Sequence, residues 1–299
     1  MYIKELFTRK KPVISLEIFP PKKESPIEVI YDTIQGLKDL RPDFISVTYG
    51  AGGSSTERTV EISSLLKNTY GIEALAHLTC IAATKEQISS IVTQLEELGI
   101  NNILALRGDL PADPDFKFPD PLHFRYARDL IIYLREHSSA CIGGACYPEG
   151  HIESPSLDQD LQHLQEKVEA GVDFLITQLF FDNDLLYNFL EKLRAKGIKV
   201  PVSAGIMPVL NRKQIERMTA LSGASLPKKF RRIMEKYEYN PEALKEAGIA
   251  YVTEQIIDLL SWGIDGVHLY TMNRPEVARR IIGNISCIRS YLGNRVDTE

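Results

Sequence analysis

The chain has 299 residues, of which 44% are hydrophobic and 25% charged, and its formal net charge is -5. This composition excludes a mainly disordered chain, and the acidic balance argues against a nucleic acid or an anionic membrane as the main partner. No stretch approaches the ~20 apolar residues that a membrane span requires. Residues 1–11 also lack the apolar core of a signal peptide.

Cysteine and histidine spacing narrows the class further. The four cysteines, Cys80, Cys141, Cys146 and Cys287, show no C-x-x-C spacing and no small disulfide scaffold. We therefore expect reduced thiols and a cytoplasmic protein. The six histidines form no pair at short ligand spacing, so a metal site is not expected.

The first predicted strand is V-I-S-L-E-I-F-P-P, residues 13–21, which the two prolines end. Its alternation puts Ser15, Glu17 and Phe19 on one face and three apolar residues on the other. Glu17 thus lies near the carboxyl end of the strand, although a solvated glutamate on a half-exposed sheet remains an ordinary alternative. Ser25 is expected to cap the following helix, with Pro26 in its first turn.

Strand and helix patterns then alternate along the whole chain. Further strands are predicted at 44–49, 73–80, 102–106, 140–147, 173–178, 200–206 and 266–270. Helices are predicted at about 26–40, 55–69, 84–98, 121–137, 156–170, 183–196, 212–221, 228–237, 241–262 and from 275 onward. A glycine turn, Gly50 to Gly53, joins the second strand to its helix and would let backbone approach a cofactor.

Eight strands, each followed by a helix and without a long linker, predict a single (β/α)8 TIM barrel over residues 1–299. An open doubly wound sheet that bound a dinucleotide would need a glycine-rich turn after the first strand. Pro20-Pro21-Lys22-Lys23 stands there instead. A barrel collects function at the carboxyl ends of its strands. The polar residues at these ends, expected to line one pocket, are Glu17, Thr48, His77, Thr79, Arg107, Asp109, Tyr147, Gln178, Tyr270 and Arg274.

Seven segments between Ile14 and Arg274 resemble, in this order, the methylenetetrahydrofolate reductases. They are V-I-S-L-E-I-F-P-P, S-V-T-Y-G-A-G-G-S, H-L-T-C, L-A-L-R-G-D-L-P, C-Y-P-E-G-H, I-T-Q-L-F-F-D and L-Y-T-M-N-R. The resemblance implies a barrel that reduces 5,10-methylenetetrahydrofolate to 5-methyltetrahydrofolate, with hydride passing from NADH or NADPH to FAD and then to folate. It also implies a homo-oligomer of the short bacterial type, because nothing that could be a regulatory domain follows residue 299.

The resemblance also implies roles for individual residues. Glu17 matches the general acid, and its position at an apolar strand end predicts a raised pKa through desolvation. Asp109 matches an aspartate near the flavin and the pterin, although it could instead cap a turn. Substrate would contact Glu17, Asp109, Gln178, Met218 and Arg274, with Arg274 placed for the glutamate carboxylate of folate.

A larger set matches positions that hold the cofactor: Thr48, Tyr49, His77, Arg107, Gly108, Asp109, Tyr147, His151, Asp160, His163 and Lys167. Asp160, His163 and Lys167 share one helix at spacings of three and four, so they face the same way, although a solvated helix face remains open. Two residues depart from the family pattern. Glu166 stands where a basic residue can occur, and Met218 where a stacking phenylalanine can occur. Met218 leaves open electrons from a partner protein, and a non-redox folate transferase barrel is the other alternative.

Overall fold

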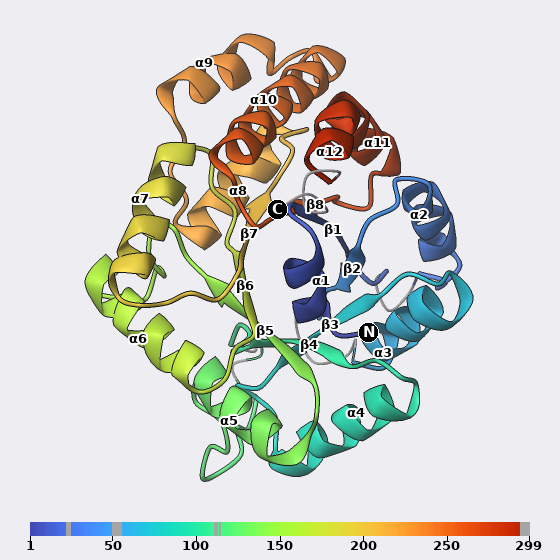
Figure 1. Ribbon diagram of the computed structural model, residues 1–299, viewed down its shortest axis with the longest axis vertical. Coiled ribbons are helices and arrows are strands. Elements are labelled where there is room, and N and C mark those ends of the chain that lie inside the picture. Colours follow the sequence, from blue (N-terminus) through green and yellow to red (C-terminus); the bar gives the residue numbers. More distant parts are fainter. Residues whose placement is uncertain (22–24, 50–55, 111–112, 114, 294–299) are drawn as a thin grey trace.

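Eight parallel strands close into one barrel in the order β1 to β8, with β1 pairing β8 (Figure 1). The structure is a computed structural model, and it describes residues 1–21, 25–49, 56–110, 113 and 115–293. The strands are β1 (Val13–Ile18), β2 (Phe44–Val47), β3 (Ala74–Thr79), β4 (Asn102–Leu106), β5 (Cys141–Cys146), β6 (Phe174–Thr177), β7 (Val202–Ile206) and β8 (Gly266–Tyr270). The predicted (β/α)8 barrel is confirmed, and the glycine turn from Gly50 to Gly53 lies outside the described residues.

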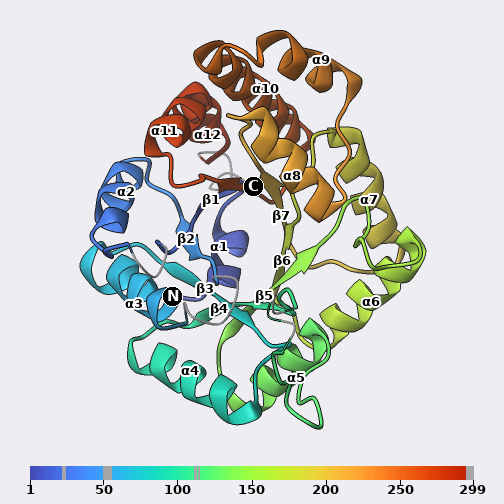
Figure 2. The same cartoon turned by 180° about the vertical axis from the view of Figure 1, so that it is seen from behind.

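The helices surround the barrel in both views, except for α1, which lies across one end of it (Figure 2). They are α1 (Ile3–Arg9), α2 (Val29–Lys38), α3 (Thr56–Ser64) with its π-helical end η1 (Leu65–Thr69), α4 (Lys85–Glu97), α5 (Ala127–His137), α6 (Leu157–Glu169), α7 (Asn183–Ala195), α8 (Arg212–Ser222), α9 (Lys228–Tyr237), α10 (Pro241–Trp262), α11 (Pro275–Asn284) and α12 (Ser286–Gly293). The predicted cap by Ser25 is wrong. Helix α2 begins three residues later than Pro26, with Glu28 as its N-cap and no side-chain capping bond.

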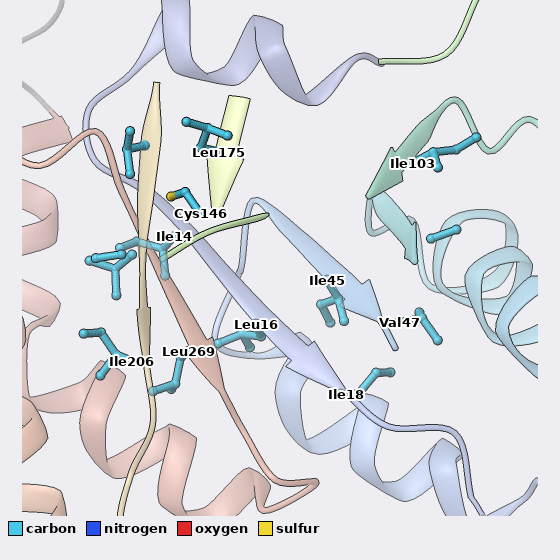
Figure 3. Packing of buried hydrophobic residues seen from close by; sticks show 14 of the residues in the cluster. Ile14, Leu16, Ile18, Ile45, Val47, Ile103, Cys146, Leu175, Ile206 and Leu269 are labelled. Atoms are coloured by element: carbon cyan, nitrogen blue, oxygen red, sulfur yellow. The ribbon is translucent and has the colours of Figure 1, made fainter. Parts of the chain in front are cut away.

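The outward face of the strands packs against this helical layer. Ile14, Leu16 and Ile18 of β1 are at most 1% exposed and belong to a cluster that continues through the other strands and the inner faces of the helices (Figure 3). All six residues of β1 are buried, so the half-exposed sheet is excluded. The alternation in β1 instead separates an apolar outer face from an inner face that carries Ser15 and Glu17.

Apolar side chains fill the inner face toward the amino-terminal end of the strands, where α1 covers the opening (Figure 1). Ile3 and Leu6 of α1 pack there against residues that include Phe44 and Phe174. Buried Asn102 fixes α1 by accepting a hydrogen bond from the Ile3 N–H at 2.7 Å. We call this end of the barrel the floor and the end at the carboxyl ends of the strands the rim. Because α1 closes the floor, a site can form only at the rim.

Aspartates that precede the strands bind the segment containing α1 to the floor. Ion pairs join Lys4 to Asp173 at 3.2 Å, Lys10 to Asp43 at 2.8 Å and Lys11 to Asp265 at 2.8 Å. Each aspartate also accepts a hydrogen bond from the backbone N–H of a neighbouring strand. The same carboxylates therefore pair with backbone N–H groups at the beginnings of strands and hold the segment containing α1 against the barrel.

At the rim, α8 and α9 extend the connection between β7 and α10 and form a small core of their own. This rim core contains Leu179, Met207, Phe230 and Met234 among its buried members, with Met218 packed against it. None of the described helices is both long and apolar enough to cross a membrane.

Candidate active site

The centre of the rim site is the carboxylate of Glu17, which is 6% exposed and points into the barrel. Three groups surround its Oε2 atom. Ser46 Oγ donates to it at 3.1 Å, His268 Nε2 lies at 3.2 Å and His77 Nε2 at 3.4 Å. Within the described chain Oε1 has no hydrogen-bond partner, so it is the oxygen that can meet a ligand.

Behind Glu17, a buried chain of polar groups fixes the orientation of His268. Its Nδ1 lies 2.7 Å from Ser15 Oγ, and both residues are fully buried. If Nδ1 accepts from Ser15, Nε2 is the ring nitrogen that donates to Glu17. Two adjacent strands, β1 and β8, thus hold one continuous hydrogen-bonded string.

The pKa of Glu17 is the reverse of what the sequence predicted. Burial favours the neutral carboxyl and acts to raise the pKa, but the hydrogen bond from His268 and the electrostatic attraction of the His77 and His268 rings for the carboxylate together outweigh burial. The Ser46 hydroxyl adds to the same effect, so the pKa lies below its ordinary value. The prediction of a raised Glu17 pKa is therefore wrong. Glu17 is ionised near neutral pH in the ligand-free protein.

His77 contributes a buried nitrogen that lacks a well-directed partner. Burial lowers the pKa of His77 to about 4, although the charge of Glu17 acts against this, so the ring is neutral near pH 7. Its Nε2 atom approaches Glu17 but makes no hydrogen bond. Buried polar atoms are rarely left unpaired, so this nitrogen is a candidate ligand contact. His77 and Tyr49 also line the same small hollow.

A second group of predicted residues lies at the ends of β4 and β5. Arg107 forms a two-bonded ion pair with Glu153, one of whose distances is 2.9 Å. This pairing raises the pKa of Arg107. The Tyr147 ring packs edge-on against His151 with centroids 4.7 Å apart, and burial raises the pKa of Tyr147 to about 12. Asp109 is exposed, and its charge acts on both Arg107 and Tyr147.

Gly108, between Arg107 and Asp109, shows why this segment needs glycine. Its φ is 84°, and a Cβ there would lie 2.8 Å from the Cβ of Thr79. The backbone N–H groups of Cys80 and Ile81 donate to the Arg107 carbonyl at 3.1 and 2.9 Å. The β3 and β4 ends are thus held together closely enough to exclude a side chain at position 108.

The predicted residues of α6 divide between the interior and the surface. Asp160 is 8% exposed and accepts from Ser154 Oγ at 3.0 Å, and Lys167 Nζ donates to the Ala145 carbonyl at 2.8 Å. Burial lowers the pKa of Lys167. His163 is exposed on the same helix. Glu166, where relatives can carry a cation, pairs with Arg128 of α5 at 2.6 Å.

The predicted substrate residues lie around the rim. Gln178 and Tyr147 line the same small pocket, and the Gln178 Oε1 accepts from the Leu179 N–H at 2.9 Å, which leaves the amide nitrogen for a ligand. Met218 is partly buried against the rim core, and the Arg274 side chain is 63% exposed. Tyr270 neighbours Glu17 in the ladder, and burial together with the Glu17 charge raises the pKa of Tyr270. A single pocket lined by all of these residues stays a prediction.

Comparison with known proteins identifies the family. Residues 2–286 match the family model described as methylenetetrahydrofolate reductase. The chain belongs to the methylenetetrahydrofolate reductase family.

Relatives of this reductase family member come from bacteria, fungi and plants. It is 35% identical over 268 residues to the 5,10-methylenetetrahydrofolate reductase of Escherichia coli, covering 90% of this chain and 88% of that one. It is 36% identical over 293 residues to methylenetetrahydrofolate reductase 1 of Schizosaccharomyces pombe, covering 97% and 48%. With methylenetetrahydrofolate reductase (NADH) 1 of Arabidopsis thaliana it shares 35% identity over 297 residues, covering 96% and 50%. The chain thus spans about half the length of the yeast and plant relatives.

Among solved structures, the methylenetetrahydrofolate reductase family member resembles an uncharacterized Clostridium thermocellum protein that binds two copies of 5-methyl-5,6,7,8-tetrahydrofolic acid. The TM-score is 0.68 at 17% identity, and the likeness covers 96% of this chain and 98% of that one. At this identity the likeness shows the shared fold.

Sequence reasoning missed several residues of this reductase family site, namely Ser15, Ser46, Glu153, His268 and Asn273. His268 could have been found, because the period of two in a strand puts it on the same inner face of β8 as Gly266 and Tyr270. Glu153 and Asn273 had no comparable signal, since each depends on a partner from a distant segment.

Proposed function

We propose that this chain reduces 5,10-methylenetetrahydrofolate to 5-methyltetrahydrofolate, with FAD as the hydride carrier and a reduced nicotinamide as the donor. Membership of the family and the names of its relatives support the substrate. The observation that carries the proposal is the buried Glu17 carboxylate, with three partners at Oε2 and Oε1 left for a ligand. A carboxyl so held can deliver a proton at one defined point.

Glu17 would protonate the nitrogen that leaves when the five-membered ring of the folate opens. The lowered pKa of the ligand-free protein means that the carboxylate must first take up a proton. A folate ring over Oε1 would displace water and add desolvation, which raises the carboxyl pKa toward the value of a working acid. His268 would keep Oε2 engaged, so the proton would sit on Oε1.

The side chains at the rim fit FAD. The unpaired Nε2 of His77 would meet a flavin edge. The Arg107 guanidinium would bind the diphosphate by exchanging its two bonds to Glu153 for bonds to phosphate oxygens. When bound, FAD supplies the hydride transfer that no side chain can perform. The remaining residues proposed to hold it are Thr48, Tyr49, Gly108, Asp109, Tyr147, His151, Asp160, His163 and Lys167.

Three further residues would contact folate or act on the flavin. The exposed carboxylate of Asp109 would disfavour negative charge on the reduced cofactor and so promote hydride release. The free amide nitrogen of Gln178 can donate to a pterin acceptor. Arg274, which reaches solvent beside the rim, would pair with the glutamate carboxylate.

For the donor, NADH is favoured by the name of the Arabidopsis relative. Met218 packs into the rim core and cannot stack on a nicotinamide as an aromatic ring would, which keeps a protein electron donor as the alternative. A homo-oligomer and a cytoplasmic location complete the proposal.

Replacing the proton donor tests this function. In Glu17→Gln we expect FAD to bind and to be bleached by NADH at the normal rate, because neither step needs the proton. Folate reduction should fall by roughly 10²- to 10⁴-fold, the usual contribution of a general acid. Anaerobic stopped-flow absorbance with NADH and NADPH separately measures both half-reactions.

Glu191→Gln is the matched control, because Glu191 is an exposed glutamate on the outer helix α7, and its turnover should equal that of the original protein. Unchanged folate reduction in Glu17→Gln would remove Glu17 from the acid role. A colourless protein that cannot be reconstituted with FAD would overturn the flavin mechanism and favour a non-redox folate transferase.

A further inference from the structure

The turn that follows β8 holds an uncommon backbone conformation. Met272 and Asn273 are consecutive non-glycine residues with φ values of 54° and 52°. Side chains disfavour this left-handed region, and such residues persist where the surroundings fix them, typically at functional sites. Arg274, the proposed partner of the folate carboxylate, comes directly after this turn.

The Asn273 side chain fixes the turn by binding both polar groups of one distant residue. The Phe19 N–H donates to Asn273 Oδ1 at 2.9 Å, and Asn273 Nδ2 donates to the Phe19 carbonyl at 2.9 Å. The ladder between β1 and β8 ends at the Glu17 and Tyr270 pair. Asn273 therefore continues this ladder with a side chain after the strands have ended.

Thr271 binds the same strand one step earlier. Its hydroxyl and its N–H both donate to the Glu17 carbonyl, at 2.6 and 3.3 Å. The Asn273 N–H donates in turn to Thr271 Oγ1 at 3.2 Å. The backbone of Glu17 and that of Phe19, two residues after it, are thus both tied to the segment that leads to Arg274.

We propose that Asn273 is a positioning residue that sets the distance between the Glu17 carboxyl and the Arg274 guanidinium. This inference rests on the proposed function, in which Glu17 meets the pterin and Arg274 meets the glutamate end of folate. A glycine would adopt the observed φ more readily. Asparagine tolerates it and also supplies the donor and the acceptor that pair with one peptide unit.

Binding of folates with and without the glutamate tail tests this role. The probes are 5-methyltetrahydrofolate and its tail-less analogue, 5-methyltetrahydropteroate, titrated into FAD-loaded protein by calorimetry. The original protein should prefer the tailed compound by roughly 10- to 100-fold, the worth of a well-placed charged hydrogen bond. Arg274→Ala should lose that preference.

Asn273→Gly suits the backbone but removes both bonds to Phe19, and we expect it to lose most of the tail preference while still binding the tail-less compound. Asn273→Asp keeps only the acceptor and should be intermediate. The double variant Asn273→Gly with Arg274→Ala should be no worse than Arg274→Ala alone. Arg41→Gly, which relieves a φ of 49° away from the site, is the matched control and should keep the full preference.

The outcomes separate the two proposals. Full tail preference in Asn273→Gly, or equal weakening for both compounds, overturns the positioning role and leaves the proposed function intact. Failure of the original protein to bind either compound overturns the proposed function and the positioning role together.

Discussion

At the scale of single residues, one carboxylate and two imidazoles share the inner face of the barrel within hydrogen-bonding range. His77 lowers the stability of the fold in acid, because its pKa is lower in the folded protein than in the unfolded chain. The folded pKa is about 4, against 6.5 for the free side chain. Between these two values the unfolded state binds more protons, so stability falls as the pH is lowered.

His77→Gln should therefore flatten the acid side of the stability profile. The original protein should lose about 3 kcal/mol of stability between pH 6.5 and pH 4 through His77, and the variant should not. Glu17 acts in a lower window, since its lowered pKa stabilises the fold above its unfolded value of 4.5 and that contribution is lost as pH falls through the folded value. Urea unfolding at several pH values measures the slope. His163→Gln, at an exposed position, is the control, and an equal slope in His77→Gln would contradict the assignment.

Residue-scale properties were the least predictable from sequence. The strand-end position of Glu17 followed from alternation and two prolines, which are local signals. Its pKa depends on His268, 251 positions away, and on His77 from β3. Desolvation alone, the part that the sequence offered, gave the wrong direction.

At the scale of elements, α1 is the feature that the sequence did not predict. It has seven residues, of which two are buried, and so short a helix is stable only through its tertiary contacts. The contact that places it is Asn102, which is fully buried at the start of β4 and also donates to the Ala74 carbonyl and to Glu73.

Asn102→Ala should destabilise the protein by about 2 to 3 kcal/mol, because it leaves buried backbone groups unpaired. Lys4→Ala removes a floor ion pair whose lysine is half exposed and should lose less than about 1 kcal/mol. Both variants should keep normal turnover, since the floor lies at the opposite end of the barrel from the rim. Denaturant midpoints and steady-state rates provide the measurements, and equal losses in the two variants would argue against the role of Asn102.

At the scale of the whole molecule, one large cluster joins strands to helices, while α8 and α9 rest on the separate rim core. Helix α8 buries only Ile215, whereas α7, a comparable helix of the outer layer, buries four residues. Local opening needs little free energy where few apolar side chains must be exposed. Helix α8 should therefore open independently of the barrel.

Hydrogen exchange followed by mass spectrometry should show this difference directly. Amides of α8 should exchange at least roughly 100-fold faster than those of β1 and β8, which open only with the whole barrel. Helix α7 is the internal reference and should behave like the strands. Protection of α8 equal to that of α7 would show that α8 and the barrel unfold as one unit.

The global architecture was more accessible from sequence than either smaller scale. Each strand carries its own apolar run and turn residues, and repeated strand-helix units leave few ways to close. Boundaries at 102–106 and 266–270 matched the structure without change. The rim core was not predicted, because its buried members come from two separate segments, one after β6 and one after β7.

The polar string from Ser15 to Glu17 occupies space that barrels of this kind usually fill with branched aliphatic side chains. Replacing these polar residues by apolar ones would be the most direct way to raise thermal stability. The same substitutions would remove the Glu17 carboxyl. Stabilising substitutions should therefore be placed at the floor, where α1 packs against the strands at the opposite end of the barrel from Glu17.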